Sequence, residues 1–146
     1  MPMASRTSTD PSPAVLRELA QFRYRLRLFL RFSERAARAA GVTPLQHQLL
    51  LGVAGFTGRG WATISDLTEC LQERHNAVVA LVNRAVGAGL VRKSRDAADR
   101  RVVRVTLTPS GRRILARLTR KHREELAHFP RGRLLPGGPA SGRESA

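Results

Sequence analysis

The segment RDAADRRVVRVTLTPSGRR, residues 95–113, decides the fold of this chain. It opens with charge, including the run DRR at 99–101. Apolar and polar residues then alternate over 102–107, a pattern typical of a half-buried strand. The Thr-Pro pair at 108–109 fits the start of a helix, because the first helical turn does not need the N–H that proline lacks. The segment therefore predicts a charged turn, a strand and a new helix.

A matching strand precedes the charged turn. Residues 90–94, LVRKS, complete a two-stranded hairpin with its tip at 95–101. Asp99 either holds the guanidinium of Arg101 or fixes the turn by accepting backbone N–H groups, and the alternative is an ordinary solvated turn residue. The hairpin is strongly basic, carrying Arg92, Lys93, Arg95, Arg100, Arg101 and Arg104 against Asp96 and Asp99.

Two helices with a short polar turn between them are predicted before the hairpin. The first follows WATISDLTECLQ, in which Thr63 caps and Asp66 occupies the third helical position. The second lies within ERHNAVVALVNRAVGAGLV at 73–91. Its apolar stripe consists of Val78, Leu81, Val82 and Ala85. This order is that of a helix-turn-helix, whose second helix enters the DNA major groove, with the basic hairpin as its wing.

A long helix is predicted over residues 14–40, ending at Gly41. Its apolar residues follow the spacing of a heptad seam at Val15, Leu19, Phe22, Leu26 and Phe29. So apolar a helix needs partners on more than one side, and we favour a dimerisation helix over a core helix of a monomer. A further helix begins at Pro44, with Thr43 and Gln46 forming a capping box.

The domain organisation follows from these elements. We expect a disordered N-terminus at 1–13, a dimerisation helix at 14–40, the winged helix-turn-helix domain at 41–109 and a C-terminal dimerisation helix at 110–129. The Gly/Pro/Ser-rich tail at 130–146 is expected to be disordered. The fold class is mainly α with a small β-wing, framed by terminal helices.

Composition favours a nucleic-acid partner. The 146 residues carry 26 Lys and Arg against 11 Asp and Glu, a formal net charge of +15, which attracts polyanions. No apolar run approaches the roughly 18 residues of a membrane span, and no signal peptide is evident, so we expect a cytoplasmic protein without a membrane partner. No catalytic motif, metal-ligand spacing or cofactor-binding loop is present, and we expect neither an enzyme nor a bound metal or cofactor.

Residues 67–111 resemble the multiple-antibiotic-resistance regulator (MarR) family of winged-helix transcription factors. The matching motifs are LTECL at 67–71, LVNRAVGAGLV at 81–91, DRR at 99–101, VRVTLT at 103–108 and Gly111. TPLQHQLLL at 43–51 is similar to the second helix of the family, and the likeness covers about 16–129. The chain departs from the family where PRGRLLPGGPASGRESA replaces a further dimer helix.

The resemblance implies a set of DNA-binding residues. Asp99 and Arg101 match the wing aspartate and its minor-groove arginine, accompanied by Arg95 and Arg100. Arg84 matches the arginine of an Asp-Arg pair in the recognition helix, with Asn83 in place of the acid. The remaining base-reading or phosphate-contacting positions of that helix are Arg74, His75, Asn76, Ala77, Val79 and Ala80. Because many members carry Ser, Pro and Thr there, the family's target sequence does not transfer to this chain.

The resemblance also implies a small aromatic effector, bound between the dimer helices and the DNA-binding lobe. Candidate lining residues are Phe22, Tyr24, Arg25, His47 and Trp61, although such residues more often belong to a core. Likewise, Cys70 is interpreted as a structural thiol rather than a redox sensor. The predicted function is a homodimeric, sequence-specific repressor of transcription, released by the effector from its double-stranded DNA. The alternative is a nonspecific architectural DNA-binding protein.

Overall fold

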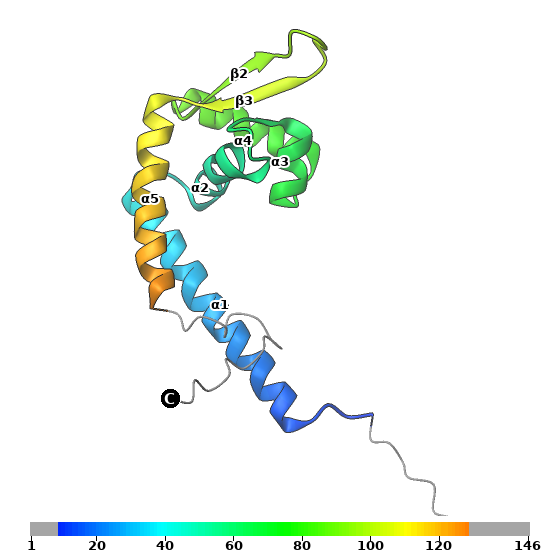
Figure 1. The fold of residues 1–146 in the computed structure, drawn as a ribbon, viewed down its shortest axis with the longest axis vertical. Helices are drawn as coiled ribbons and strands as arrows, with labels where there is room; N and C mark the ends of the chain where they lie inside the picture. The colour runs from blue at the N-terminus through cyan, green and yellow to red at the C-terminus, as the bar shows by residue number, and fades with distance from the viewer. Residues whose placement is uncertain (1–8, 129–146) are drawn as a thin grey trace, which may run out of the picture.

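The computed structural model describes residues 9–128 (Figure 1). Its elements are α1 (Pro13–Ala39), α2 (Pro44–Leu51), the π-helical turn η1 (Gly52–Phe56), β1 (Ala62–Thr63), α3 (Ile64–Leu71), α4 (His75–Gly87), β2 (Val91–Arg95), β3 (Val103–Leu107) and α5 (Pro109–Ala127). They form a mainly helical winged helix-turn-helix with one helix at either end, as the sequence predicts. Of the segments expected to be disordered, 1–13 and 130–146, residues 1–8 and the whole tail lie outside the described residues. Ser12 caps α1, which begins at Pro13, inside the first of these segments. Within residues 9–128, no helix has the length and apolarity to cross a membrane.

Three helices, α2, α3 and α5, begin at side-chain caps that can be recognised in the sequence. Thr43 and Thr63 each accept a hydrogen bond from the backbone N–H three residues later, and the side-chain oxygens of Gln46 and Asp66 accept one from the backbone N–H of the cap residue. Thr108 caps α5 in the same sense. These bonds satisfy N–H groups that a helix N-terminus otherwise leaves open, so both predicted capping boxes are confirmed.

The wing is a three-stranded antiparallel sheet in the order β1-β3-β2. The two main strands lie within one residue of their predicted starts, with Lys93 opposite Val105 and Arg95 opposite Val103. The third strand is the short β1, whose Ala62 pairs with Val105. Val105 and Leu107 point into the core, which explains the alternation along β3.

One hydrophobic core joins the helix-turn-helix to the sheet and to α5. The predicted stripe of α4 is fully buried in it, at Val78, Leu81, Val82 and Ala85. In contrast, α1 buries only Ser33, Ala36 and Ala37, close to its C-terminal end. Its N-terminal half extends away from the rest of the protomer (Figure 1), so the apolar seam has no partner there among the described residues.

Candidate nucleic-acid interface

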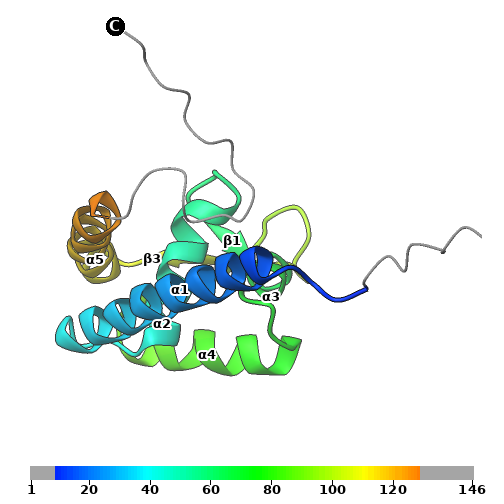
Figure 2. The same ribbon diagram turned by 90° about the horizontal axis from the view of Figure 1, so that it is seen from below.

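The exposed face of α4 carries most of the predicted base-reading residues. His75, Asn76, Ala77, Ala80 and Arg84 are all exposed, because the apolar stripe turns the opposite side of the helix into the core. Val79 is half-buried at the edge of the stripe. Figure 2 shows α4 along one side of the body, where a groove of DNA could receive it.

The N-terminus of α4 is open. Arg74 is the N-cap, with extended backbone, and it offers no side-chain oxygen to the first-turn N–H groups. Those N–H groups and the positive end of the helix dipole favour an anion such as a DNA phosphate. Arg74 therefore lies beside the first helical turn rather than within it.

Asn83 ties the helix to the wing. Lys93 on β2 donates a hydrogen bond from Nζ to Oδ1 of Asn83, at 2.5 Å. Since an amide is neutral, this bond positions Lys93 without cancelling its charge, which a carboxylate at 83 would do. Asn83 thus has a partner within the chain, a contact that the sequence analysis does not anticipate.

The wing tip holds Arg101 in a defined position. Asp99 Oδ1 accepts both the backbone N–H of Arg101, at 3.1 Å, and its Nε–H, at 3.2 Å. Both interpretations of Asp99 therefore apply at once, since the carboxylate fixes the turn and orients the guanidinium. The Arg101 side chain is nevertheless 92% exposed, so its charge remains accessible to a ligand.

A second aspartate builds the turn behind Asp99. The Oδ1 atom of Asp96 accepts the N–H groups of Ala98 and Asp99, at 2.7 and 3.1 Å. These backbone bonds, of which that of Asp99 is the larger cause, lower the pKa of Asp96, and the bond from Arg104 lowers it further. Opposite, Arg95 donates from Nη1 to the carbonyl oxygen of Arg100, at 2.8 Å, so Arg95 closes the tip.

Trp61 lies between two guanidinium groups beneath the wing. Arg59 stacks on its ring at 3.9 Å from the centroid, and Arg104 at 4.0 Å. Arg59 pairs with Asp66 at 2.7 Å, and Arg104 pairs with Asp96. The pKa of Asp66 is lowered, chiefly by the backbone N–H of Thr63. In the sequence, Arg104 is simply a basic residue of the hairpin. This network could not be predicted there, because it depends on the pairing of β1 with β3.

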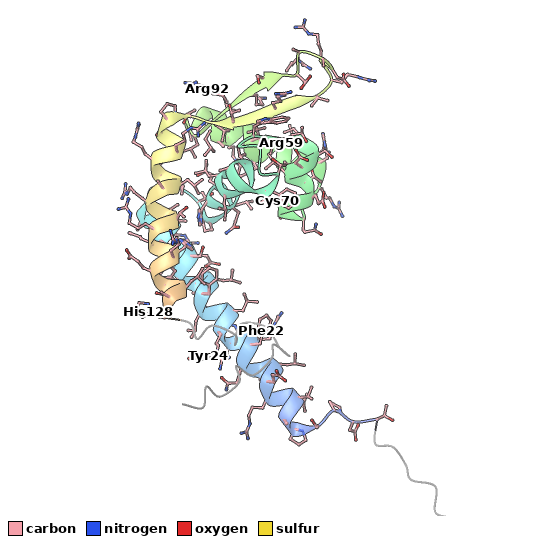
Figure 3. The ribbon with its side chains drawn as sticks, viewed as in Figure 1. Phe22, Tyr24, Arg59, Cys70, Arg92 and His128 are labelled. Atoms are coloured by element: carbon pink, nitrogen blue, oxygen red, sulfur yellow. The ribbon has the colours of Figure 1, made fainter. Side chains whose placement is uncertain are left out.

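The five candidate effector residues do not gather in this protomer. Phe22 and Tyr24 lie on the projecting half of α1, far from Arg59 and the wing (Figure 3), and Arg25 is on the same segment. Trp61 is occupied by its two arginines, and His47 is buried on α2. One protomer does not bring these five residues together. An effector site that uses all of them remains a prediction.

A hollow that the sequence does not reveal runs along α5. This open groove has a volume of about 840 Å³, with Leu107, Leu115 and Ala116 among its apolar residues. Its charged lining consists of three cations, Arg112, Arg120 and Arg123, and one carboxylate, Glu124, so cations outnumber anions there. An apolar surface bordered by arginines suits an amphipathic anion.

His47 packs against His122 where α1, α2 and α5 meet, with the ring centroids 4.7 Å apart. His122 lies close to the Leu118 carbonyl through Nδ1, at 2.6 Å, which makes Nδ1 the donor, and its Nε2 meets Ser33 Oγ at 2.8 Å. Within residues 9–128, Nδ1 of His47 has no hydrogen-bond partner. Burial, and then the charge of His122, lower the pKa of His47.

Cys70 has the surroundings of a structural thiol. It packs against Gly52, where an added Cβ would lie 3.1 Å from its Sγ. Burial, and then the neighbouring Glu69, raise the pKa of the thiol. Because the thiolate is the reactive form, Cys70 is less reactive than a free cysteine. No group of three or more metal-ligating side chains occurs among residues 9–128.

Known proteins resemble this chain in sequence and in fold. The family model described as "MarR family" matches residues 40–102, from the end of α1 to the wing. No curated protein matches the sequence.

Solved structures share the fold at low sequence identity. A MarR family protein from Bacillus stearothermophilus is 24% identical, with a TM-score of 0.68 and 81% of each chain covered. AbsC, a MarR family transcriptional regulator from Streptomyces coelicolor, is 21% identical, with a TM-score of 0.66 over 84% of this chain and 80% of its own. A point mutant of MepR from S. aureus, bound to an oligodeoxyribonucleotide, is 18% identical, with a TM-score of 0.60 over 84% and 87%.

Proposed function

We propose that the chain, whose residues 40–102 match the model of the MarR family, is a member of that family and acts as a homodimer on a specific DNA operator, as a repressor released by a small molecule. It is a DNA-binding transcriptional regulator, as members of the family are. The dimer, the sequence specificity, the repression and the effector are the proposal.

One observation carries the proposal. The exposed polar face of α4 and the exposed Arg101, which Asp99 orients, belong to one folded unit. The hairpin projects beside α4 (Figure 1), and the two are joined by the Lys93–Asn83 bond. With α4 in a major groove, the wing tip reaches the adjacent minor groove, where the negative potential attracts a guanidinium.

Specific binding further requires a second copy. One α4 reads only a few base pairs, whereas two copies related by a twofold axis read an inverted repeat with half-sites about one helical turn apart. The exposed apolar residues in the N-terminal half of α1 offer the surface for such a dimer. Two of its large apolar residues, Val15 and Leu19, are each 46% exposed in the protomer.

For the effector, the α5 groove is a better candidate than the five residues named from the sequence. Its apolar lining and its three arginines suit a small aromatic anion. A ligand that binds only one arrangement of α5 and the DNA-binding lobe would shift the dimer away from the DNA-binding arrangement.

The proposal is tested by selecting bound sequences from a random duplex pool at near-physiological salt. We expect enrichment of an inverted repeat, bound at least about 10³-fold more tightly than random DNA. Tight binding without any enriched sequence would overturn the proposal. That outcome would favour the alternative, an architectural DNA-binding protein whose +15 charge supplies nearly all the affinity.

A further inference from the structure

We propose that Arg59, Trp61 and Arg104, with the carboxylates Asp66 and Asp96, form a clamp that holds the wing in the position from which Arg101 reaches DNA. We call this set the Trp61 clamp. The inference deepens the proposed function and rests on it. It makes Trp61 and Arg104 positioning residues, which act on DNA through the tip and not by contact.

The clamp follows from the register of the sheet. Thr63 on β1 lies opposite Arg104 on β3. Because side chains alternate between faces, Trp61 lies on the same face as Thr63, diagonal to Arg104, within reach of a long side chain. The Arg104 guanidinium accordingly stacks on the ring at 4.0 Å from its centroid. Arg59, in the loop between η1 and β1, makes the second stacking contact with the ring, at 3.9 Å from its centroid.

One end of the clamp is attached to the first turn of α3, and the other end to the turn at the wing tip. Arg59 pairs with Asp66, the residue that completes the capping box of α3, so one end is fixed to the helix-turn-helix. Arg104 donates from Nε to Oδ2 of Asp96 at 2.7 Å. Oδ1 of the same carboxylate accepts the backbone N–H groups of Ala98 and Asp99 at the tip. Successive contacts therefore run from the start of α3 to the residue that orients Arg101.

The charges show that the clamp positions the wing and does not itself attract DNA. Two guanidinium groups meet two carboxylates, so the set carries no net charge. Arg104, although basic, is paired with Asp96 and stacked on Trp61, and its side chain is 40% exposed. Arg101 is also paired, with Asp99, but its side chain is 92% exposed. Of these two guanidinium groups, that of Arg101 is therefore the more accessible to phosphates and to the minor groove.

A lysine cannot replace Arg104 in this geometry. The guanidinium is planar, so it stacks on the indole and still presents two N–H groups to Asp96, whereas an ammonium is a compact point charge. Arg104→Lys therefore keeps the net charge and removes the clamp. Trp61→Phe keeps an aromatic face and preserves the stack, while Trp61→Ala removes it.

The first experiment needs no DNA. Hydrogen exchange is measured on residues 96–101 of the full chain, together with the emission of Trp61, which is the only tryptophan in the sequence. We expect faster exchange at Ala98 and Asp99 and a shifted emission in Arg104→Lys, wild-type exchange in Trp61→Phe, and no change in Arg117→Lys, an exposed position on α5. Unchanged exchange at the tip in both Arg104→Lys and Trp61→Ala would overturn the clamp.

The second experiment measures affinity for the sequence selected with the wild-type protein. We expect Arg104→Lys to bind it about tenfold more weakly, with wild-type affinity in Trp61→Phe and in Arg117→Lys. Random DNA should be bound almost equally by all, because the charge is unchanged. If exchange at the tip rises but specific affinity stays at the wild-type value, the positioning role is wrong. If the wild-type protein selects no sequence, the proposed function fails, whatever the clamp variants do in the exchange measurement.

Discussion

Arg101 is exposed and yet constrained. Its guanidinium and its backbone N–H both bond to Asp99, so little side-chain freedom remains to be lost when it enters a groove. This is an arrangement in which a carboxylate near a DNA-binding arginine can strengthen recognition, although the pair carries no net charge. It also explains an acidic residue in so basic a hairpin.

We predict that Arg101→Ala weakens binding to the selected operator by about 1–3 kcal/mol, because the minor-groove contact of the wing is lost. Fluorescence anisotropy with labelled operator measures the change. Arg117→Ala removes the same charge from the exposed side of α5 and should have a much smaller effect. Equal losses in both variants would mean that Arg101 acts only through the net charge.

His47 makes the stability of the fold depend on pH. Its folded-state pKa lies below the ordinary value, so the unfolded chain takes up a proton more readily. Stability is therefore complete above about pH 6.5 and falls as the pH drops below that value, by at most about 1.4 kcal/mol per pH unit. Urea unfolding at pH 7.5 and 5.5 measures this loss.

A histidine elsewhere provides the control for this pH dependence. His47→Gln should reduce the loss between the two pH values, while His75→Gln, on the exposed start of α4, should leave it at the wild-type size. The comparison uses the difference between pH values, so a constant destabilisation by glutamine does not affect it. A wild-type pH dependence in His47→Gln would exclude His47 as its source.

At the scale of elements, the wing, α4 and α5 are joined at one small contact. The Thr108 hydroxyl donates to the carbonyl oxygen of Gly89, at 2.6 Å, and accepts the N–H of Gly111, at 3.0 Å. The first turn of α5 therefore lies directly on the end of the loop after α4, against Leu90. Glycine at 111 allows this approach, because a Cβ there would overlap the carbonyl oxygen of Leu90.

We expect Gly111→Ala to destabilise the fold by about 3 kcal/mol or more, since the overlap is with backbone, which cannot rotate away. Gly87→Ala is the matched control, because an added Cβ at this last residue of α4 meets nothing within 4 Å. There, alanine should stabilise the protein by up to about 1 kcal/mol through helix propensity. Thermal or urea unfolding distinguishes the two, and equal effects would contradict the packing explanation.

At the scale of the whole molecule, α1 reaches beyond the core that it helps to form. It packs on α2 and α5 through its C-terminal half, from Phe29 onwards, while its N-terminal half projects (Figure 1) and carries exposed Val15, Leu16 and Leu19. A single protomer gives this surface no cover among residues 9–128. The apolar seam and the need for two half-sites thus favour the same assembly.

We predict that Leu19→Glu shifts the protein towards monomer at low micromolar concentration, because a carboxylate would be buried in the dimer contact. Arg17→Gln lowers the net charge by the same one unit, and its position two residues away is about 200° around the helix, so it should leave the dimer intact. Light scattering coupled to size-exclusion chromatography measures the mass. A dimer of wild-type stability in Leu19→Glu would exclude this face as the interface.

Local sequence patterns are sufficient to predict where the helices and strands lie and which residues of α4 are exposed. Capping residues such as Thr43 and Thr63, the stripe on α4 and the alternation in β3 are local patterns, so their reading needs no knowledge of distant residues. The pairing of Asp99 with Arg101 can be predicted for the same reason, since they lie only two positions apart in the sequence.

Contacts between residues far apart in the chain depend on the tertiary structure and cannot be predicted from local patterns. Trp61 meets Arg104 because β1 pairs with β3, Asn83 meets Lys93 because the wing folds back on α4, and His47 meets His122 because α5 returns to α2. Periodicity indicates which face of an element is buried, but not which side chain lies opposite it. For this reason the sequence shows Arg104 only as a basic residue of the hairpin, whereas in the structure it stacks on Trp61 and pairs with Asp96.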